Sequence, residues 1–189
     1  MRTAGSRRPR PSSPPSVTLF RHAIALIGLA PPCVSAAVVA VSPSGFVIRH
    51  ETSVAAPPAQ VYETITRIGS WWSPRHTYSH DAANLSLDAH AGGCFCERLP
   101  NGGSIEHMRV LYVAPGKTIR MSGALGPLQA HGLAGSLTWN LAPAGEGTTL
   151  TVTYSVGGFM EGGFEKMAPG VDGMWAEQVQ RLKGYIEGK

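Results

Sequence analysis

The sequence predicts an α+β fold in which a curved antiparallel sheet of about six to seven strands wraps around a long C-terminal helix, with two short helices after the first strand. Short segments with alternating apolar and polar residues predict half-buried strands. Turn signals such as Asn101-Gly102 and Pro115-Gly116 separate them, and short turns join antiparallel neighbours. Apolar residues at helical spacing between Val171 and Ile186 predict the helix that covers the sheet.

The elements are expected in the order strand, helices, strands, long helix. After the first strand, Pro57-Pro58 favours a helix start and Gly69 a helix end. Residues 73–83 are expected to be an irregular loop, and the glycine-rich residues 157–163 a flexible lid before the last helix. The strands are expected at residues 46–54, 84–88, 94–99, 104–113, 118–123, 133–141 and 148–156.

The charge of the chain is unevenly distributed. The formal net charge is +4, but five of the 16 Lys and Arg residues lie in the first 22 positions. The remaining 11 nearly balance the 12 Asp and Glu residues, all of which lie after residue 45. Phosphate binding needs clustered positive charge. We therefore expect no nucleic-acid partner.

The first 37 residues are expected to be a leader and signal peptide, followed by one domain over residues 46–189. Arg21 precedes a short apolar run, and Val34 and Ala36 form a cleavage site of the A-x-A type. The run is too short and too interrupted by proline to span a bilayer. We expect a periplasmic or secreted bacterial protein cleaved near Ala36. The alternative is that this run is a buried segment of the domain.

Several short motifs follow one another over residues 46–187. They are Val54-Ala-Ala-Pro-Pro-Ala-Gln-Val-Tyr62, Trp71-Trp72, Gly92-Gly93-Cys94-Phe95, Val110-Leu-Tyr-Val-Ala-Pro115, Gly147-Thr148-Thr149-Leu150, and Trp175 with Leu182-Lys183-Gly184-Tyr185. In their order and spacing these motifs resemble the START/polyketide-cyclase superfamily of helix-grip proteins, also called SRPBCC, and the closer likeness is to its branch of heat-shock ATPase activators. The resemblance implies a hydrophobic cavity between sheet and helix, but no single function, because members bind lipids and hormones, cyclise polyketides or assist chaperones.

Counting back from the hairpin turns assigns the central strands to two faces, because opposed residues share a face. The more apolar face is expected to line the cavity, and it places Glu97 directly opposite Glu106. A bulge in these strands would flip part of this assignment. The predicted cavity face carries Phe95, Glu97, Leu99, Glu106, Met108, Val110, Tyr112, Ile119 and Met121.

The candidate catalytic residues, should the protein be an enzyme, are Glu97, Glu106 and His76. Two opposed buried carboxylates would need a shared proton, a cation or a polar ligand. The alternative is that both reach water near the hairpin tip. His76 lies in the predicted loop, where it can act as a general acid or base at the cavity mouth or simply be a satisfied loop residue.

A weak metal candidate is formed by Cys94, Cys96 and His107, whose side chains are expected on the outer face. Two thiolates and an imidazole suit zinc, but no fourth ligand is evident. The cysteines could instead form a disulfide, link two chains, or be simple small strand residues. No motif implies a cofactor.

The expected partner is a small apolar molecule; a protein partner cannot be named. Three functions are compatible with the sequence: a carrier or sensor of such a molecule, a cyclase or dehydratase using cavity carboxylates for proton transfer, and a chaperone-assisting module. The candidate ligand-binding residues, for which core packing is an equal alternative, are Trp71, Trp72, Tyr78, Phe95, Met108, Tyr112, Met121, Leu137, Trp139 and Trp175.

Overall fold

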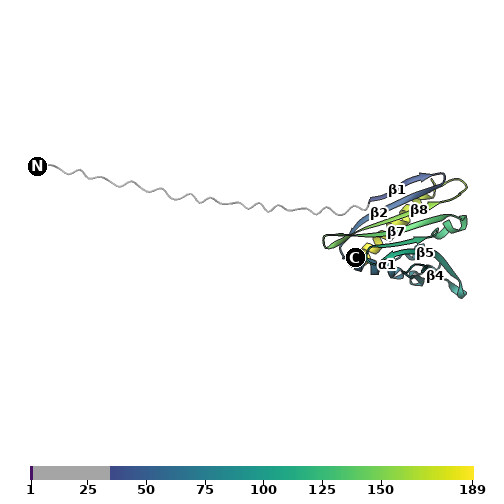
Figure 1. Ribbon diagram of the computed structural model, residues 1–189, viewed down its shortest axis with the longest axis horizontal. Helices are drawn as coiled ribbons and strands as arrows, with labels where there is room; N and C mark the ends of the chain where they lie inside the picture. Colours follow the sequence, from purple (N-terminus) through teal and green to yellow (C-terminus); the bar gives the residue numbers. More distant parts are fainter. Residues whose placement is uncertain (2–34) are drawn as a thin grey trace. The chain divides into compact units, whose positions relative to one another are not determined.

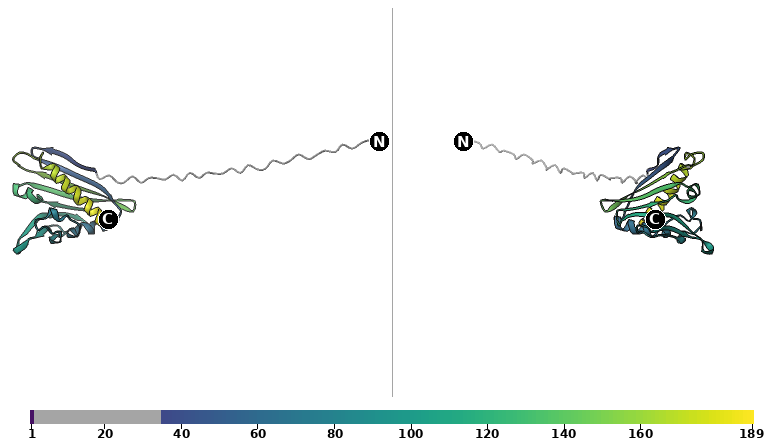
Figure 2. Two further views of the ribbon diagram at one scale, coloured as in Figure 1. Left: turned by 180° about the vertical axis from the view of Figure 1, so that it is seen from behind. Right: turned by 45° about the vertical axis from the view of Figure 1, so that its right-hand side comes forward.

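The expected fold is confirmed by a computed structural model, which describes Met1 and residues 35–189. Eight antiparallel strands form one sheet in the order β1-β2-β8-β7-β6-β5-β4-β3 (Figure 1). The long helix α2 (Ala168–Glu187) lies across one face of the sheet (Figure 2). The strands are β1 (Ser35–Ser42), β2 (Gly45–Val54), β3 (Leu85–Leu87), β4 (Cys94–Arg98), β5 (Ser104–Ala114), β6 (Thr118–Ser122), β7 (Ala134–Ala144) and β8 (Gly147–Gly157).

Strand β1 was not expected from the sequence, because its small and apolar residues resemble a continuation of the leader. It pairs with β2 from Ser35 opposite Glu51 to Ser42 opposite Gly45, and so extends the sheet beyond the expected start of the domain. Of the expected leader and signal peptide, residues 2–34 lie outside the part of the chain that the structure describes, and the expected cleavage position at Ala36 falls within β1. None of the helices in the described part of the chain combines the length and the apolar character needed to cross a membrane.

One α-helix and several short turns connect β2 to β3. Helix α1 (Pro58–Thr66) begins at a proline, whose missing N–H costs nothing in a first helical turn. The 3-10 turns η1 (Ile68–Ser70), η2 (Pro74–His76) and η3 (Ala82–Asn84) follow, so the second expected short helix is a 3-10 turn. These turns carry the loop that borders the site described below.

The core under α2 is filled by tryptophans. Trp139 of β7 and Trp175 of α2 contact each other edge to face with ring centroids 5.7 Å apart. Trp72 packs on Trp175 at 5.7 Å, and Trp71 packs on Trp139 at 6.0 Å. All four side chains are buried. Because aromatic residues dominate the area that a core buries, this cluster fixes α2 on the sheet.

Two β-bulges change the faces predicted for β5. Phe95 lies opposite Met108 as expected, but Cys96 lies opposite Glu106, so His107 is an extra residue in β5. A second shift between Val110 and Tyr112 makes Leu111 an extra residue. Each bulge inserts one residue and moves the following side chains to the other face.

The bulges overturn three predicted placements. Glu106 points outward and pairs with Arg109, while Glu97 lies opposite Ile105, so the opposed carboxylates do not exist. Tyr112 is 50% exposed on the outer face, where its ring lies under the guanidinium of Arg120. His107, expected outside, is buried on the inner face.

Candidate functional site

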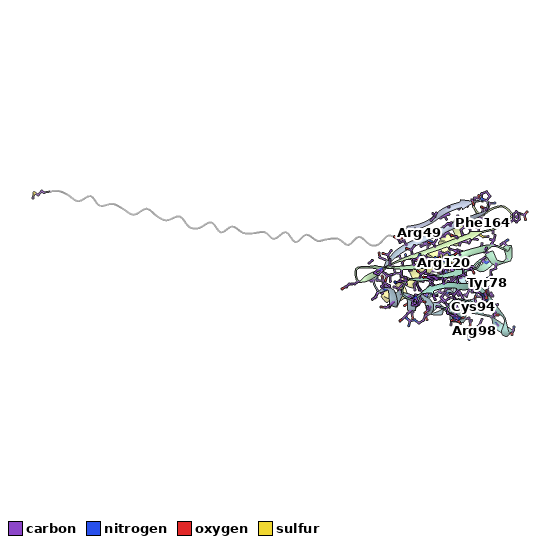
Figure 3. All side chains as sticks on the ribbon, in the orientation of Figure 1. Arg49, Tyr78, Cys94, Arg98, Arg120 and Phe164 are labelled. Carbon is purple, nitrogen blue, oxygen red and sulfur yellow. A yellow bond between two sulfur atoms is a disulfide. The ribbon has the colours of Figure 1, made fainter. Side chains whose placement is uncertain are left out.

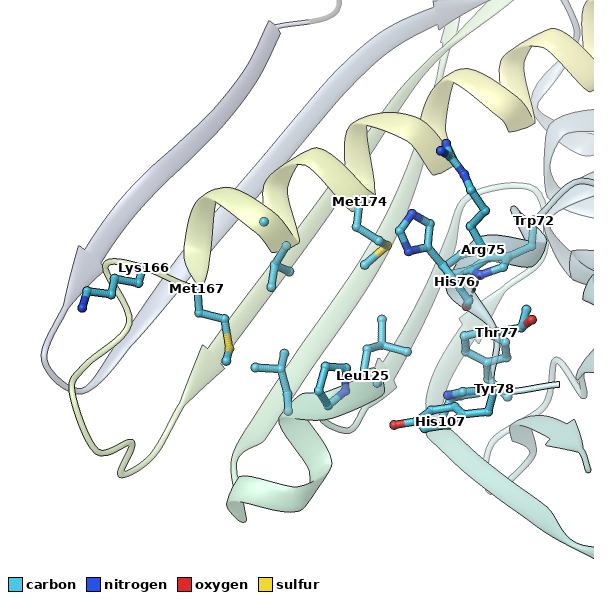
Figure 4. Close-up of a pocket in the computed structure, with 16 residues that line it drawn as sticks. Trp72, Arg75, His76, Thr77, Tyr78, His107, Leu125, Lys166, Met167 and Met174 are labelled. Carbon is cyan, nitrogen blue, oxygen red and sulfur yellow. Dashed lines mark hydrogen bonds between the residues drawn. The ribbon is translucent and has the colours of Figure 1, made fainter. Parts of the chain in front are cut away.

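A cavity of about 610 Å³ lies between the first half of α2, the loop of residues 72–78, strands β4 and β5, and residues 125–128 (Figure 4). Met167 and Met174 border it on the side of α2, and Tyr78 and His107 lie across from them. Most of its lining is apolar, and includes Trp72, Phe95, Leu125, Leu128, Met167, Val171 and Met174. Its size and lining are typical of sites for small molecules.

The elements around the cavity follow from local sequence. The 3-10 turn η5 (Gly126–His131) starts with Gly126-Pro127, which suits a tight turn, and buries Leu128. Its Gln129 side chain donates to the carbonyl oxygen of Glu106 at 2.6 Å and to that of His107 at 3.4 Å. This turn is therefore hydrogen-bonded to the backbone of β5 at the bulge.

A buried acid–imidazole pair lies at the wall of the cavity. His107 Nε2 and Glu97 Oε2 are 2.9 Å apart, and the two residues are only 4% and 1% exposed. The carboxylate also accepts hydrogen bonds from the backbone N–H groups of Tyr78 at 3.1 Å and Ser79 at 2.5 Å. Glu97 thus ties the loop of residues 73–83 to strand β4.

The protonation state of this pair follows from its surroundings. Burial alone would raise the pKa of Glu97, but hydrogen bonds from Ser79, Tyr78 and His107 outweigh burial and hold the pKa below its ordinary value of 4.5. Burial lowers the pKa of His107 below 6.5, and Glu97 only partly offsets this. At neutral pH the pair is therefore a carboxylate and a neutral imidazole.

A neutral imidazole beside a carboxylate has one possible tautomer. An ionised carboxylate only accepts hydrogen bonds, so His107 carries its proton on Nε2 and a lone pair on Nδ1. This Nδ1 is buried and has no hydrogen-bond partner among the described residues. The rings of Tyr78 and Phe95 lie against the imidazole, with centroids 6.1 Å and 4.9 Å away.

His76 and Arg75 border the cavity but are held by α2. His76 Nε2 lies 3.1 Å and Arg75 Nη2 lies 2.9 Å from Glu177 Oε2. Hydrogen bonding to Ser73, helped by Arg75 and His76 and opposed by burial, lowers the pKa of Glu177 to about 2. This carboxylate therefore links the loop that borders the cavity to α2.

The structure brings only some of the predicted ligand-binding residues to the cavity. Trp72, Tyr78 and Phe95 line it, and so does His76. Tyr112 faces solvent and cannot contact a ligand there. The others are buried in the core and do not border the cavity: Trp71, Met108, Met121, Leu137, Trp139 and Trp175. A catalytic role for Glu97 or His76 stays a prediction, whereas Glu106 lies outside the cavity.

The three residues of the weak metal candidate do not converge on one site. Cys94 and Cys96 are joined by a disulfide with their Cα atoms 5.4 Å apart on the outer side of β4 (Figure 3). His107 points to the opposite face because of the bulge. Across Met1 and residues 35–189 no three Cys, His, Asp or Glu side chains converge in a way that could hold an ion.

Sequence reasoning missed several residues of the site. His107 was placed on the wrong face, and Leu125, Leu128, Met167 and Met174 were not singled out. Leu125 and Leu128 lie in a segment without clear periodicity, so their position became visible only with η5 in place. The resemblance to a cavity-forming fold was the signal for a site, but it did not locate these side chains.

The fold and the cavity define a helix-grip protein with a small-molecule pocket. A family model described as polyketide cyclase / dehydrase and lipid transport matches residues 46–187. The chain belongs to this family, which confirms the superfamily inferred from the sequence motifs. A search among curated proteins found no sequence that matches.

Solved structures share this fold at low sequence identity. The protein MLL2253 from Mesorhizobium loti is 19% identical with a TM-score of 0.55, and the match covers 76% of this chain and 98% of that one. The Aha1 dimer from Colwellia psychrerythraea is 22% identical with a TM-score of 0.54, covering 75% and 96%. DynU16, described as a putative protein in the dynemicin biosynthetic locus, is 24% identical with a TM-score of 0.54, covering 75% and 47%.

Proposed function

We propose that this protein binds a small, largely apolar molecule in the cavity between α2 and the sheet. The observation that carries the proposal is the cavity itself, which keeps about 610 Å³ free beside a core packed around four buried tryptophans. Burying apolar ligand surface gains roughly 25 cal/mol per Å², so an apolar lining favours an apolar occupant. The methionines supply a wall that adapts to ligand shape.

Two glycines on α2 provide a matched pair for testing the cavity. Gly170 borders the cavity, and a Cβ atom added there meets nothing within 4 Å. Gly173, less than one turn further along, has equally free surroundings but does not border the cavity. A large side chain at Gly170 should therefore fill the pocket, and the same side chain at Gly173 should not.

The test is a fluorescence titration with the apolar probe N-phenylnaphthylamine. We expect saturable binding to the wild-type protein, a loss of affinity of at least about tenfold in Gly170→Trp, and wild-type affinity in Gly173→Trp, since filling the pocket removes most of the buried contact. Equal affinity of all three proteins would show that the probe binds elsewhere, and would contradict the proposal.

We also propose that the protein acts after export from the cytoplasm. The support is the signal-like leader in the sequence together with the Cys94–Cys96 disulfide, because disulfides persist in oxidising compartments. Intact-mass analysis of protein from its own host should give a first residue close to Ala37. A mature chain that retains the first 30 residues would contradict export by cleavage.

A further inference from the structure

The strongest unexplained feature of the molecule is the buried Nδ1 atom of His107. Its ring borders the cavity, its other nitrogen is engaged by Glu97, and Nδ1 has no hydrogen-bond partner within residues 35–189. A buried acceptor without a donor destabilises the structure by the full desolvation penalty of the group. Such a group at the wall of a ligand cavity, within reach once a covering side chain moves, points to a missing partner that belongs to the ligand.

We propose that His107 Nδ1 is the hydrogen-bond acceptor for the ligand, and that the ligand is an apolar molecule bearing a hydroxyl donor, of the class of phenols and enols. This inference rests on the proposed binding function and narrows its ligand class. The lone pair on Nδ1 excludes a carbonyl or ether oxygen as its partner, because two acceptors repel each other.

Glu97 is the positioning residue for this acceptor. Its carboxylate accepts from Nε2 at 2.9 Å and fixes both the ring orientation and the tautomer. Two backbone N–H groups, of Tyr78 and Ser79, hold the carboxylate in turn. The imidazole that carries this acceptor is therefore held in place by a buried carboxylate, which is itself fixed by two backbone hydrogen bonds.

Tyr78 controls access to the acceptor. Its ring stacks on the imidazole and lines the cavity, and the residue is 49% exposed. A rotation of the Tyr78 side chain can therefore move the ring away from His107 without disturbing the core. The groups that face His107 are Glu97 from β4 and Tyr78 from the loop. Arg75, His76 and Lys166 border the same cavity as further charged or titratable groups.

The test compares β-naphthol with its methyl ether, which shares the naphthalene ring but lacks the hydroxyl donor, by calorimetric titration at neutral pH. We expect the wild-type protein to prefer the naphthol at least about tenfold, because only the naphthol satisfies the buried acceptor. Binding of the ether also shows that a protein variant is folded, because the apolar contacts of the ether do not depend on Nδ1. Binding of neither ligand would contradict the proposed function, whereas equal binding of both would contradict this inference alone.

Four variants test whether the preference for β-naphthol over its ether arises from His107 Nδ1. His107→Phe should lose it, because the ring keeps its place but has no acceptor. Glu97→Gln should lose or invert it, because an amide can donate to Nε2 and force the proton onto Nδ1. Loss of the preference in Tyr78→Phe would make the tyrosine hydroxyl the acceptor and would overturn the proposal. The matched control Glu106→Gln, on the outer face of the same hairpin, should keep the preference.

The pH dependence gives a readout that a purely structural role would not move. Protonation of His107 turns Nδ1 into a donor, so the preference for the naphthol should disappear as the pH falls through the pKa of His107. That pKa lies below 6.5, so the loss should occur in more acidic solution than for free imidazole. A preference that persists in His107→Phe, or that does not change with pH, would overturn the proposal.

Discussion

At the residue scale, Glu97 and Glu106 show how environment decides the role of a side chain. Both are glutamates on the two strands of one hairpin. Glu97 is buried with three hydrogen-bond donors around its carboxylate. The Glu106 side chain is 44% exposed and pairs with Arg109 in water, where an ion pair contributes little stability. The same substitution should therefore have different consequences at the two positions.

Glu97→Gln should lower the free energy of unfolding by roughly 1–3 kcal/mol at neutral pH, because the amide must place an N–H group against the backbone N–H of either Tyr78 or Ser79. Glu106→Gln should change it by less than about 0.5 kcal/mol. Urea unfolding at pH 7 measures both values. Equal effects would mean that the Glu97 network does not stabilise the fold.

The sign of the pH dependence follows from the lowered pKa of Glu97. A carboxyl group whose folded pKa lies below its unfolded value of 4.5 contributes stability above that value. This contribution is lost as the pH falls through the folded pKa. The stability difference between wild type and Glu97→Gln should therefore be full near pH 7 and shrink below about 4.5. A difference that grows in acid would contradict this assignment.

At the element scale, the bulge in β5 is the feature that creates the site. It turns His107 inward beside Met108 and leaves their backbone against Gly123, which follows β6. Gly123 has φ +147°, and a Cβ atom there would lie 2.7 Å from the carbonyl oxygen of His107. Only glycine adopts this conformation without strain while allowing such a close approach.

Gly123→Ala should destabilise the protein by roughly 1–3 kcal/mol and weaken binding of β-naphthol, because β5 must shift at His107. Gly173→Ala, the same change inside α2 with nothing within 4 Å, should stabilise it by about 0.5–1 kcal/mol. Thermal unfolding of the two variants checks both signs. A stable Gly123→Ala protein with unchanged binding would show that the bulge tolerates a side chain.

The same element explains how far the sequence could predict the structure. In β7 and β8 the alternation is regular, and Leu137, Trp139, Leu150 and Tyr154 are buried as their pattern indicates. In β5 the polar and apolar residues are mixed, so nothing in the sequence marks His107 as an extra residue. A shift of one residue moves side chains to the other face, and this is why the fold was predictable while the acidic pair was not.

At the scale of the whole molecule, the space between α2 and the sheet holds a packed tryptophan cluster and, next to it, the cavity. The tryptophan cluster holds the helix on the sheet, and Glu177 links the helix to the loop that carries Tyr78. The cavity beyond the cluster is bordered by Met167 and Met174, whereas Met121 is buried in the core away from it. Spectroscopic signals from these three methionines can therefore distinguish binding in the cavity from binding elsewhere on the protein.

The most direct test of the account is therefore NMR of methyl-labelled methionine during titration with β-naphthol. Binding in the cavity predicts that the signals of Met167 and Met174 move together and saturate, while the signal of Met121 stays in place. Movement of Met121 alone, or no movement of Met167 and Met174 at saturating ligand, would contradict the claim that the ligand occupies this cavity.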